Sequence, residues 1–124
     1  MEKLFIASDH AAFEQKQELI DFLKKRFEMV DLGTNSSESV HYPTYGQKLA
    51  RAVLEAKGRG IALCGSGIGI SISVNRFKGI RGALCQDEND AKMSRLHNNS
   101  NVLCLAGRKT PMDDLKKIEK HLYL

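Results

Sequence analysis

A cysteine followed by alternating glycines is the segment of this sequence best suited to do chemistry. The stretch LCGSGIGI covers positions 63–70, and it predicts a strand ending at Cys64 that leads into a helix. Backbone N–H groups at a helix start favour anions, so this turn suits a phosphate or a developing oxyanion and would favour the thiolate of Cys64. The spacing GxGxG is not the dinucleotide fingerprint GxGxxG. An inert buried cysteine in a tight turn is an equally open interpretation.

A second polar cluster, Ser8-Asp9-His10, directly follows the first apolar run. Open α/β sheets bind ligands at the carboxyl ends of their strands. If the first and third strands flank the point where the strand order reverses, Asp9, His10 and Cys64 share one crevice. Taken alone, Asp9 has a commoner role as the cap of the following helix.

A third cluster, RLHNNSN, covers positions 95–101. Histidine exchanges protons near neutral pH, so His97 is a candidate acid or base, and Asn98 could orient hydroxyl groups. The simpler interpretation is an Asn-rich turn with His97 at a helix C-terminus. Arg108 follows a glycine and would either bind phosphate or be solvated. Cys85 and Cys104 are expected to be small core residues.

The elements that must position these residues follow from the periodicity of the apolar side chains. Apolar runs predict strands at Lys3–Ala7, Met29–Leu32, Gly60–Cys64, Ile80–Cys85 and Val102–Ala106. Helices are predicted over Ala11–Phe27, Thr44–Ala56, the glycine run to about Arg76, Glu88–Leu96 with Asp87 as its N-cap, and Pro111 to the end, with a polar loop at 34–39. This alternation predicts the α/β class, a three-layer α/β/α sandwich with a five-stranded parallel sheet, Rossmann-like.

Length and composition exclude several classes of protein. The 124 residues fit one domain, 1–124, and a net charge of +4 permits an anionic ligand. Few aromatic residues and no basic block argue against nucleic acid, and no apolar run approaches the roughly 20 residues of a membrane span. The three cysteines have no CxxC spacing, so neither a disulfide framework nor a zinc site is expected. A reduced, cytoplasmic protein is expected.

Four segments together resemble the family of ribose-5-phosphate isomerase B and galactose-6-phosphate isomerase. They are IASDHAAFEQK, DLGTNSSESVHYPTYG, CGSGIGISISVNRFKGIRGALC and SRLHNNSNVLCLAGR, and they occur in the family's order up to about residue 108. The resemblance implies an aldose–ketose isomerase that interconverts ribose 5-phosphate and ribulose 5-phosphate in the pentose phosphate pathway. It implies no cofactor and no metal.

The resemblance also assigns the groups at the reacting carbons. Cys64 matches the base that moves a proton between C1 and C2 of the open-chain sugar. Gly65, Gly67 and Gly69 match an anion hole for the enediolate, formed by backbone N–H groups. Ser66 stands where the family usually has threonine, and it keeps the hydroxyl.

Other matching residues imply roles along the rest of the sugar. His97 matches the residue that opens the furanose ring, and Asn98 lies beside the reacting oxygens. Asp9 matches a residue that binds sugar hydroxyls. Tyr42 lines the site.

The phosphate end of the implied site involves a second copy of the chain. His10 matches a phosphate contact, and Arg108 resembles a phosphate ligand delivered to the neighbouring subunit. The resemblance therefore implies a homodimer, or a dimer of dimers, with intersubunit active sites.

Two departures from the family pattern keep other functions open. His41 replaces the aspartate that usually precedes Tyr-Pro, and the family's C-terminal segment like EGGRHxxRV is absent from this sequence. Because arginines of that segment bind substrate phosphate, we expect a much poorer kcat/KM without it. A galactose-6-phosphate or allose-6-phosphate isomerase is the near alternative. The alternative from another class is a catalytically impaired module that binds phosphorylated sugars.

Overall fold

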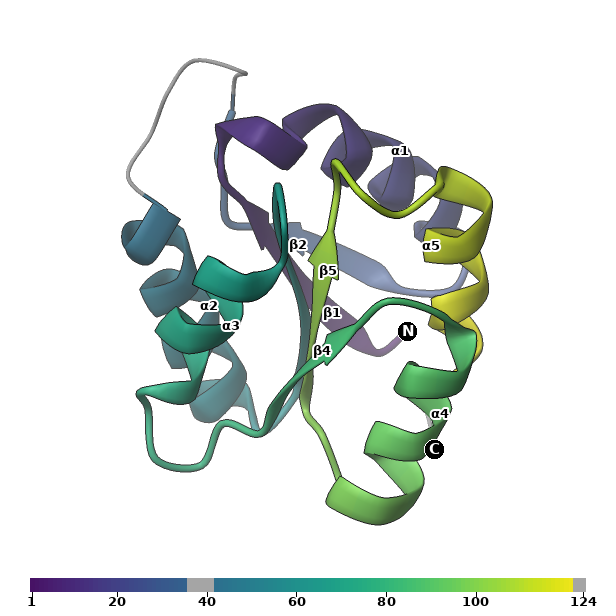
Figure 1. Cartoon of the computed structure of the whole chain (residues 1–124). Coiled ribbons are helices and arrows are strands. Elements are labelled where there is room, and N and C mark those ends of the chain that lie inside the picture. The colour runs from purple at the N-terminus through teal and green to yellow at the C-terminus, as the bar shows by residue number, and fades with distance from the viewer. Residues whose placement is uncertain (36–41, 122–124) are drawn as a thin grey trace.

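The computed structural model of the chain describes residues 1–35 and 42–121, and it shows strands and helices in regular alternation (Figure 1). The strands are β1 (Lys3–Ser8), β2 (Glu28–Asp31), β3 (Arg59–Cys64), β4 (Gly82–Cys85) and β5 (Val102–Ala106). The helices are η1 (His10–Ala12), α1 (Phe13–Leu23), α2 (Tyr42–Ala56), α3 (Ile68–Asn75), α4 (Glu88–Asn98), α5 (Met112–Ile118) and η2 (Glu119–His121).

All strand pairs in the sheet are parallel, in the order β2-β1-β3-β5-β4. Their carboxyl ends therefore form one edge of the sheet, at the top in Figure 1, which we call the carboxyl edge. The opposite edge is the amino edge. The order reverses between β1 and β3, where open sheets of this class bind ligands.

Each face of the sheet packs against its own set of helices, because successive strand residues point to opposite faces. Leu4 and Ile6 join the cluster that contains Leu19 of α1 and Leu115 of α5. The other cluster holds Phe5, Ala7 and Cys64 of the strands with residues of α2 and α3, namely Leu49, Ala50, Val53, Ile70 and Val74. Figure 1 shows the resulting three layers, which confirm the predicted α/β/α sandwich.

The predicted element bounds were wrong mainly around the first helix. The chain first forms the 3-10 turn η1, because the Asp9 carboxylate accepts a hydrogen bond from Ala11 N–H at 3.0 Å and holds the turn. The α-helix ends at Leu23 rather than Phe27, although Phe27 is still buried. Strand β4 begins at Gly82, two residues later than Ile80. Most of the predicted loop at 34–39 lies outside the described residues.

Helix α4 connects the two edges of the sheet. It starts beyond the carboxyl end of β4, where Asp87 Oδ1 accepts a hydrogen bond from Asp90 N–H at 2.8 Å, which confirms the predicted N-cap. It ends beside the amino ends of β4 and β5, because Arg81 Nε donates to the Asn98 carbonyl at 2.5 Å. An 11-residue helix is about 16 Å long, so its two ends serve different edges. Among the described residues, no helix is long and apolar enough to cross a membrane.

Candidate active site

Cys64 ends β3 at the carboxyl edge and is almost fully buried, with 5% of its surface exposed. Gly67 N–H donates to Cys64 Sγ at 3.1 Å. The sulfur thus lies within hydrogen-bonding distance of the backbone at the start of α3. The same bond uses one of the N–H groups that the sequence analysis assigned to an anion hole.

The turn after Cys64 depends on the conformation of Gly67, the N-cap of α3. Its φ is +78°, and a Cβ there would lie 2.6 Å from Leu84 Cδ1. Ser66 Oγ accepts a hydrogen bond from Ile68 N–H at 3.2 Å, and Gly69 follows in the first turn of α3. Glycine at position 67 is thus required for the turn itself.

Asp9 and His10 lie beside this turn, at the end of the neighbouring strand β1. Asp9 N–H donates to the Leu63 carbonyl at 3.2 Å, so the pairing of β1 with β3 extends as far as the site. Asp9 is 7% exposed and acts as a cap, and the half-buried His10 lies in η1. Because the strand order reverses between β1 and β3, Asp9, His10 and Cys64 lie at the same carboxyl edge of the sheet.

Arg108 lies against the glycine turn of its own chain. Gly107 N–H donates to the Cys64 carbonyl at 2.8 Å, and Arg108 N–H donates to the Gly65 carbonyl at 3.1 Å. A Cβ on Gly65 would lie 3.3 Å from Arg108 Cδ and 3.5 Å from Ala11 Cβ. The turn is therefore held between Arg108 and the loop that carries His10.

A pocket of about 280 Å³ opens beside Ser66 at the same edge. Gln86, Lys109 and Thr110 supply its polar lining. Neither Cys64 nor Asp9 is among the described residues that line this pocket. Sequence reasoning missed these three residues, although each follows a predicted strand end.

His97 and Asn98 lie away from this group. Both occupy the last turn of α4, at the amino edge, and both are exposed. Within one chain, the structure therefore brings Arg108 to the same edge as Cys64 and does not bring His97 and Asn98 there. The strand pairing keeps Arg108 with Cys64, and the length of α4 separates His97 from it. Of Tyr42, the structure describes the backbone at the start of α2 but not the side chain.

A buried ion pair supports the β1 side of the site, and sequence reasoning missed it. Lys16 Nζ lies 2.6 Å from Asp31 Oδ1, and the Lys16 side chain is fully buried. The same Asp31 oxygen accepts Gly33 N–H at 2.9 Å. Gly33 and the next residue bond to the backbone of Ser8, directly before Asp9. The sequence did carry a signal for this pair. Lys16 lies at helical spacing from Phe13 and from the apolar residues that follow it, so it falls on the buried face of α1.

The other two cysteines are core residues, as predicted. Burial, and next the charge of Asp90, raise the pKa of Cys85 to about 12. Burial also raises the pKa of Cys104. Both thiols therefore stay protonated at neutral pH.

Comparison with known proteins identifies a family for this arrangement. Residues 4–122 match the model of the Ribose/Galactose Isomerase family. Ribose-5-phosphate isomerase B of Escherichia coli is 41% identical over 121 residues, which cover 95% of this chain and 80% of that protein. A putative sugar phosphate isomerase of Bacillus subtilis, YwlF, is 41% identical over 109 residues, covering 86% of this chain and 73% of that protein.

Solved structures give the same result. Ribose-5-phosphate isomerase B of Clostridium thermocellum superposes with a TM-score of 0.94 at 45% identity, over 97% of this chain and 82% of that one. The Mycoplasma genitalium enzyme, solved with bound ribulose-5-phosphate, gives a TM-score of 0.91 at 35% identity, over 97% of this chain and 82% of that one. The chain belongs to the ribose/galactose isomerase family.

Proposed function

We propose that this protein interconverts ribose 5-phosphate and ribulose 5-phosphate, with Cys64 as the base that moves a proton between C1 and C2. A C–H bond beside a carbonyl is weakly acidic, so its cleavage needs a placed base and stabilisation of the enediolate oxygen. The observation that carries the proposal is the N–H group of Gly67 directed at Cys64 Sγ at 3.1 Å, at the point where the strand order reverses. The Mycoplasma genitalium relative with bound ribulose-5-phosphate supports the substrate class.

Residues around Cys64 take the other roles in this proposal. Ser66 and the backbone of Gly65 and Gly69 stabilise the enediolate oxygen, since the Gly67 N–H group is used by the sulfur. Asp9 binds sugar hydroxyls. His10 and Arg108, which flank the same turn, bind the phosphate, since a guanidinium matches phosphate oxygens bidentately.

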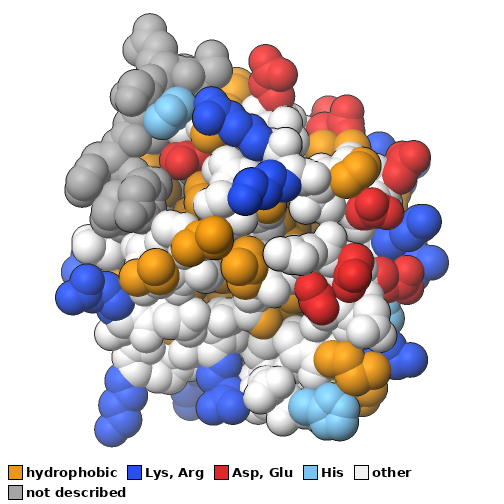
Figure 2. Space-filling view, in the orientation of Figure 1, with side chains coloured by type: hydrophobic (Ala, Val, Ile, Leu, Met, Phe, Trp, Pro, Cys, Tyr) orange, Lys and Arg blue, Asp and Glu red, His pale blue; other side chains and the backbone are white. Residues whose placement is uncertain are grey.

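His97 and Asn98 complete the site from a second copy of the chain. Within one chain they lie at the other edge of the sheet, so ring opening by His97 beside Cys64 requires a partner. Exposed apolar side chains lie beside both halves of the site: Ile68 and Ile72 on α3 are 49% and 59% exposed, and Leu96 on α4 is 57% exposed. Figure 2 shows the hydrophobic group over α3. A homodimer, or a dimer of dimers, would cover these side chains.

A steady-state assay on ribose 5-phosphate tests the proposed reaction. We expect Cys64→Ala to lose at least about a thousandfold in kcat, since it removes the base, while Cys85→Ala retains activity as the matched control. We also expect full activity in excess EDTA. Turnover by Cys64→Ala near the wild-type rate would refute the assigned base.

The six-carbon alternatives need the same assay with other substrates. The matching family model is named for both ribose and galactose isomerases, so galactose 6-phosphate and allose 6-phosphate are the competing substrates. We expect the largest kcat/KM with ribose 5-phosphate. Binding of all three sugars without turnover would favour the non-catalytic module instead.

A cytoplasmic location is part of the proposal. The described structure leaves Cys64, Cys85 and Cys104 as free thiols, which suits a reducing compartment.

A further inference from the structure

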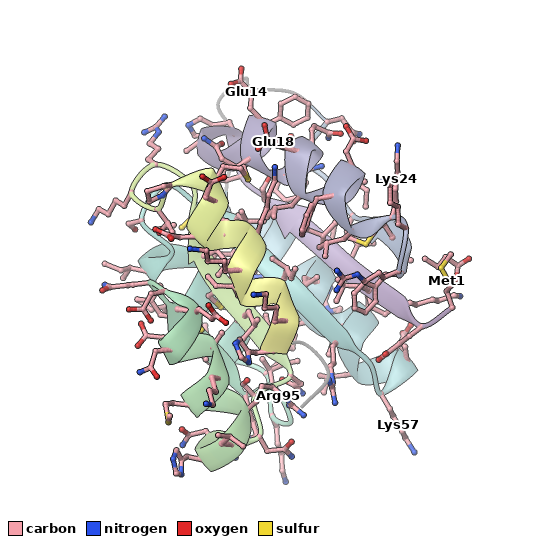
Figure 3. The ribbon with its side chains drawn as sticks, turned by 90° about the vertical axis from the view of Figure 1, so that its right-hand side faces the viewer. Met1, Glu14, Glu18, Lys24, Lys57 and Arg95 are labelled. Atoms are coloured by element: carbon pink, nitrogen blue, oxygen red, sulfur yellow. The ribbon has the colours of Figure 1, made fainter. Side chains whose placement is uncertain are left out.

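A second pocket, of about 370 Å³, lies at the amino edge of the sheet, and we call it the amino-edge pocket. Three connections and the C-terminal ends of two helices, α2 and α4, meet there. Its charged lining residues are all cationic: Lys57, Arg59, Arg81 and Arg95. Among the described residues that line it, none is an aspartate or a glutamate. Figure 3 shows Lys57 and Arg95 at the same lower end of the molecule, far from Glu14 and Glu18.

Helix capping explains two of these cations. Arg81 Nε donates to the Asn98 carbonyl, and Arg95 Nη1 donates to the Ser100 carbonyl, so both neutralise the C-terminal end of α4. Capping does not account for the other two.

Arg59 is the member without a structural explanation. It begins β3, and its Nη1 atom is buried without a hydrogen-bond partner among the described residues. A buried guanidinium nitrogen without an acceptor is costly, and so is a second cation close to it. The two cations do interact, because burial and next the charge of Arg59 lower the pKa of Arg95.

Lys57 adds a further cation in a conformation that lysine rarely adopts. Its φ is +49°, in the left-handed region, just after α2. Glycine or asparagine favours this position at a helix end. The residue found there instead is an exposed cation at the rim of the pocket.

We propose that the amino-edge pocket binds a small anion that carries a phosphate group. A phosphate dianion would supply acceptors for Arg59 Nη1 and offset the repulsion between neighbouring guanidinium groups. The cations come from different segments that converge on one volume, so a single phosphate can contact several of them. In Figure 2, basic side chains gather at the lower end of the molecule, below α3.

Titration of the ¹⁵N-labelled protein with inorganic phosphate, followed by amide NMR, tests the proposal without turnover. We expect saturable shifts at the amides of Gly58, Gly79 and Asn101, which line the pocket. Sodium chloride at equal ionic strength should not reproduce them, because screening alone is nonspecific. Phosphate that binds in the proposed active site is detected separately, by the shift of the Gly65 amide signal. A parallel titration with glycerol 2-phosphate distinguishes a phosphate ester from free phosphate as the preferred ligand.

Two variants and one control identify the pocket as the source of the shifts. Arg59→Gln should weaken phosphate binding at these amides about tenfold, the effect of one charge-assisted contact. Lys57→Asn, at an exposed position that suits asparagine, should weaken it less and keep the fold intact. Arg76→Gln removes an exposed cation outside the pocket and should change nothing.

Three results would overturn the proposal. One is the absence of saturable shifts at the pocket amides, and another is equal binding by wild type and the folded Arg59→Gln and Lys57→Asn variants. The third concerns the Arg59→Gln variant: its KM for ribose 5-phosphate would rise by the same factor by which its phosphate binding weakens. The pocket would then belong to the reacting centre. We expect that KM to change less than about twofold.

Discussion

The three cysteines of this chain carry the same free thiol group but lie in different surroundings. Cys64 ends a strand at the carboxyl edge and has an N–H group directed at its sulfur. Cys85 and Cys104 are fully buried, and burial raises the pKa of each. Neither the residue type nor a strand end selects the base, since Cys85 also ends a strand, β4. The N–H group of Gly67 directed at the sulfur is what distinguishes Cys64.

Alkylation should distinguish these thiols. With iodoacetamide at about pH 8.5, the ordinary pKa of a cysteine, we expect the folded protein to take one adduct, at Cys64. A raised pKa keeps the neutral thiol dominant until the pH exceeds that value, so Cys85 stays protonated below about pH 12. Peptide mass mapping gives the site. The unfolded protein should take three adducts, and earlier labelling of Cys85 than of Cys64 would contradict the assignment.

The ion pair between Lys16 and Asp31 makes a second residue-scale prediction. Asp31→Asn leaves the fully buried Lys16 ammonium without its counter-charge, so we expect a loss of about 3 kcal/mol in the free energy of unfolding. Urea unfolding measures it. Because Lys16→Met also removes the buried charge, the double variant with Asp31→Asn should be more stable than Asp31→Asn alone.

The same helix offers a matched control for that variant. Lys24 and Asp21 form a pair of the same residue types, with side chains 61% and 74% exposed. Asp21→Asn should therefore change stability by less than about 1 kcal/mol. Equal effects of the two Asp→Asn substitutions would show that the buried pair contributes no more than a surface one.

At the scale of elements, apolar periodicity was sufficient to predict the strands and their alternation with helices. It predicted β5 with its observed bounds and the N-cap Asp87, because both depend on neighbouring residues. It did not predict that the chain turns as η1 before α1, since a single capping bond from Asp9 decides this. Nor did it place His97 at the opposite edge from Cys64, because that separation depends on the length and direction of α4.

The glycine turn is the element whose geometry the chemistry depends on most. Gly67→Ala adds a Cβ 2.6 Å from Leu84 Cδ1 at a residue with a φ of +78°. We expect a loss of about 2 kcal/mol in stability, and a fall in kcat of at least about tenfold because the N–H group leaves Cys64 Sγ. Thermal unfolding and steady-state kinetics measure the two effects.

Gly58→Ala is the control for this substitution. Its Cβ would lie 3.4 Å from Phe5 Cε2, an ordinary contact. It should change stability by less than about 1 kcal/mol and leave kcat unchanged. If Gly67→Ala behaved in the same way, the left-handed turn would not be what positions the sulfur.

At the scale of the whole molecule, the parallel sheet separates the proposed site into two groups. Cys64, Asp9 and Arg108 lie at the carboxyl edge, and His97 with Asn98 lies at the amino edge. In the homodimer that we propose, twofold symmetry would bring the first group of one chain to the second group of its partner, twice. Each site then draws on both chains.

Mixing two inactive variants tests this arrangement. In a heterodimer of Cys64→Ala and His97→Ala chains, one site carries both substitutions and the other carries neither. Random pairing of equal amounts makes about half of the dimers heterodimers, so about a quarter of the wild-type activity should return. If His97 acted in its own chain, every site would carry one substitution and no activity would return, even in heterodimers isolated with two affinity tags. The pairing of Cys64→Ala with Arg108→Ala should restore nothing, because the structure keeps these residues in the same half of the site, so both sites of that heterodimer are impaired.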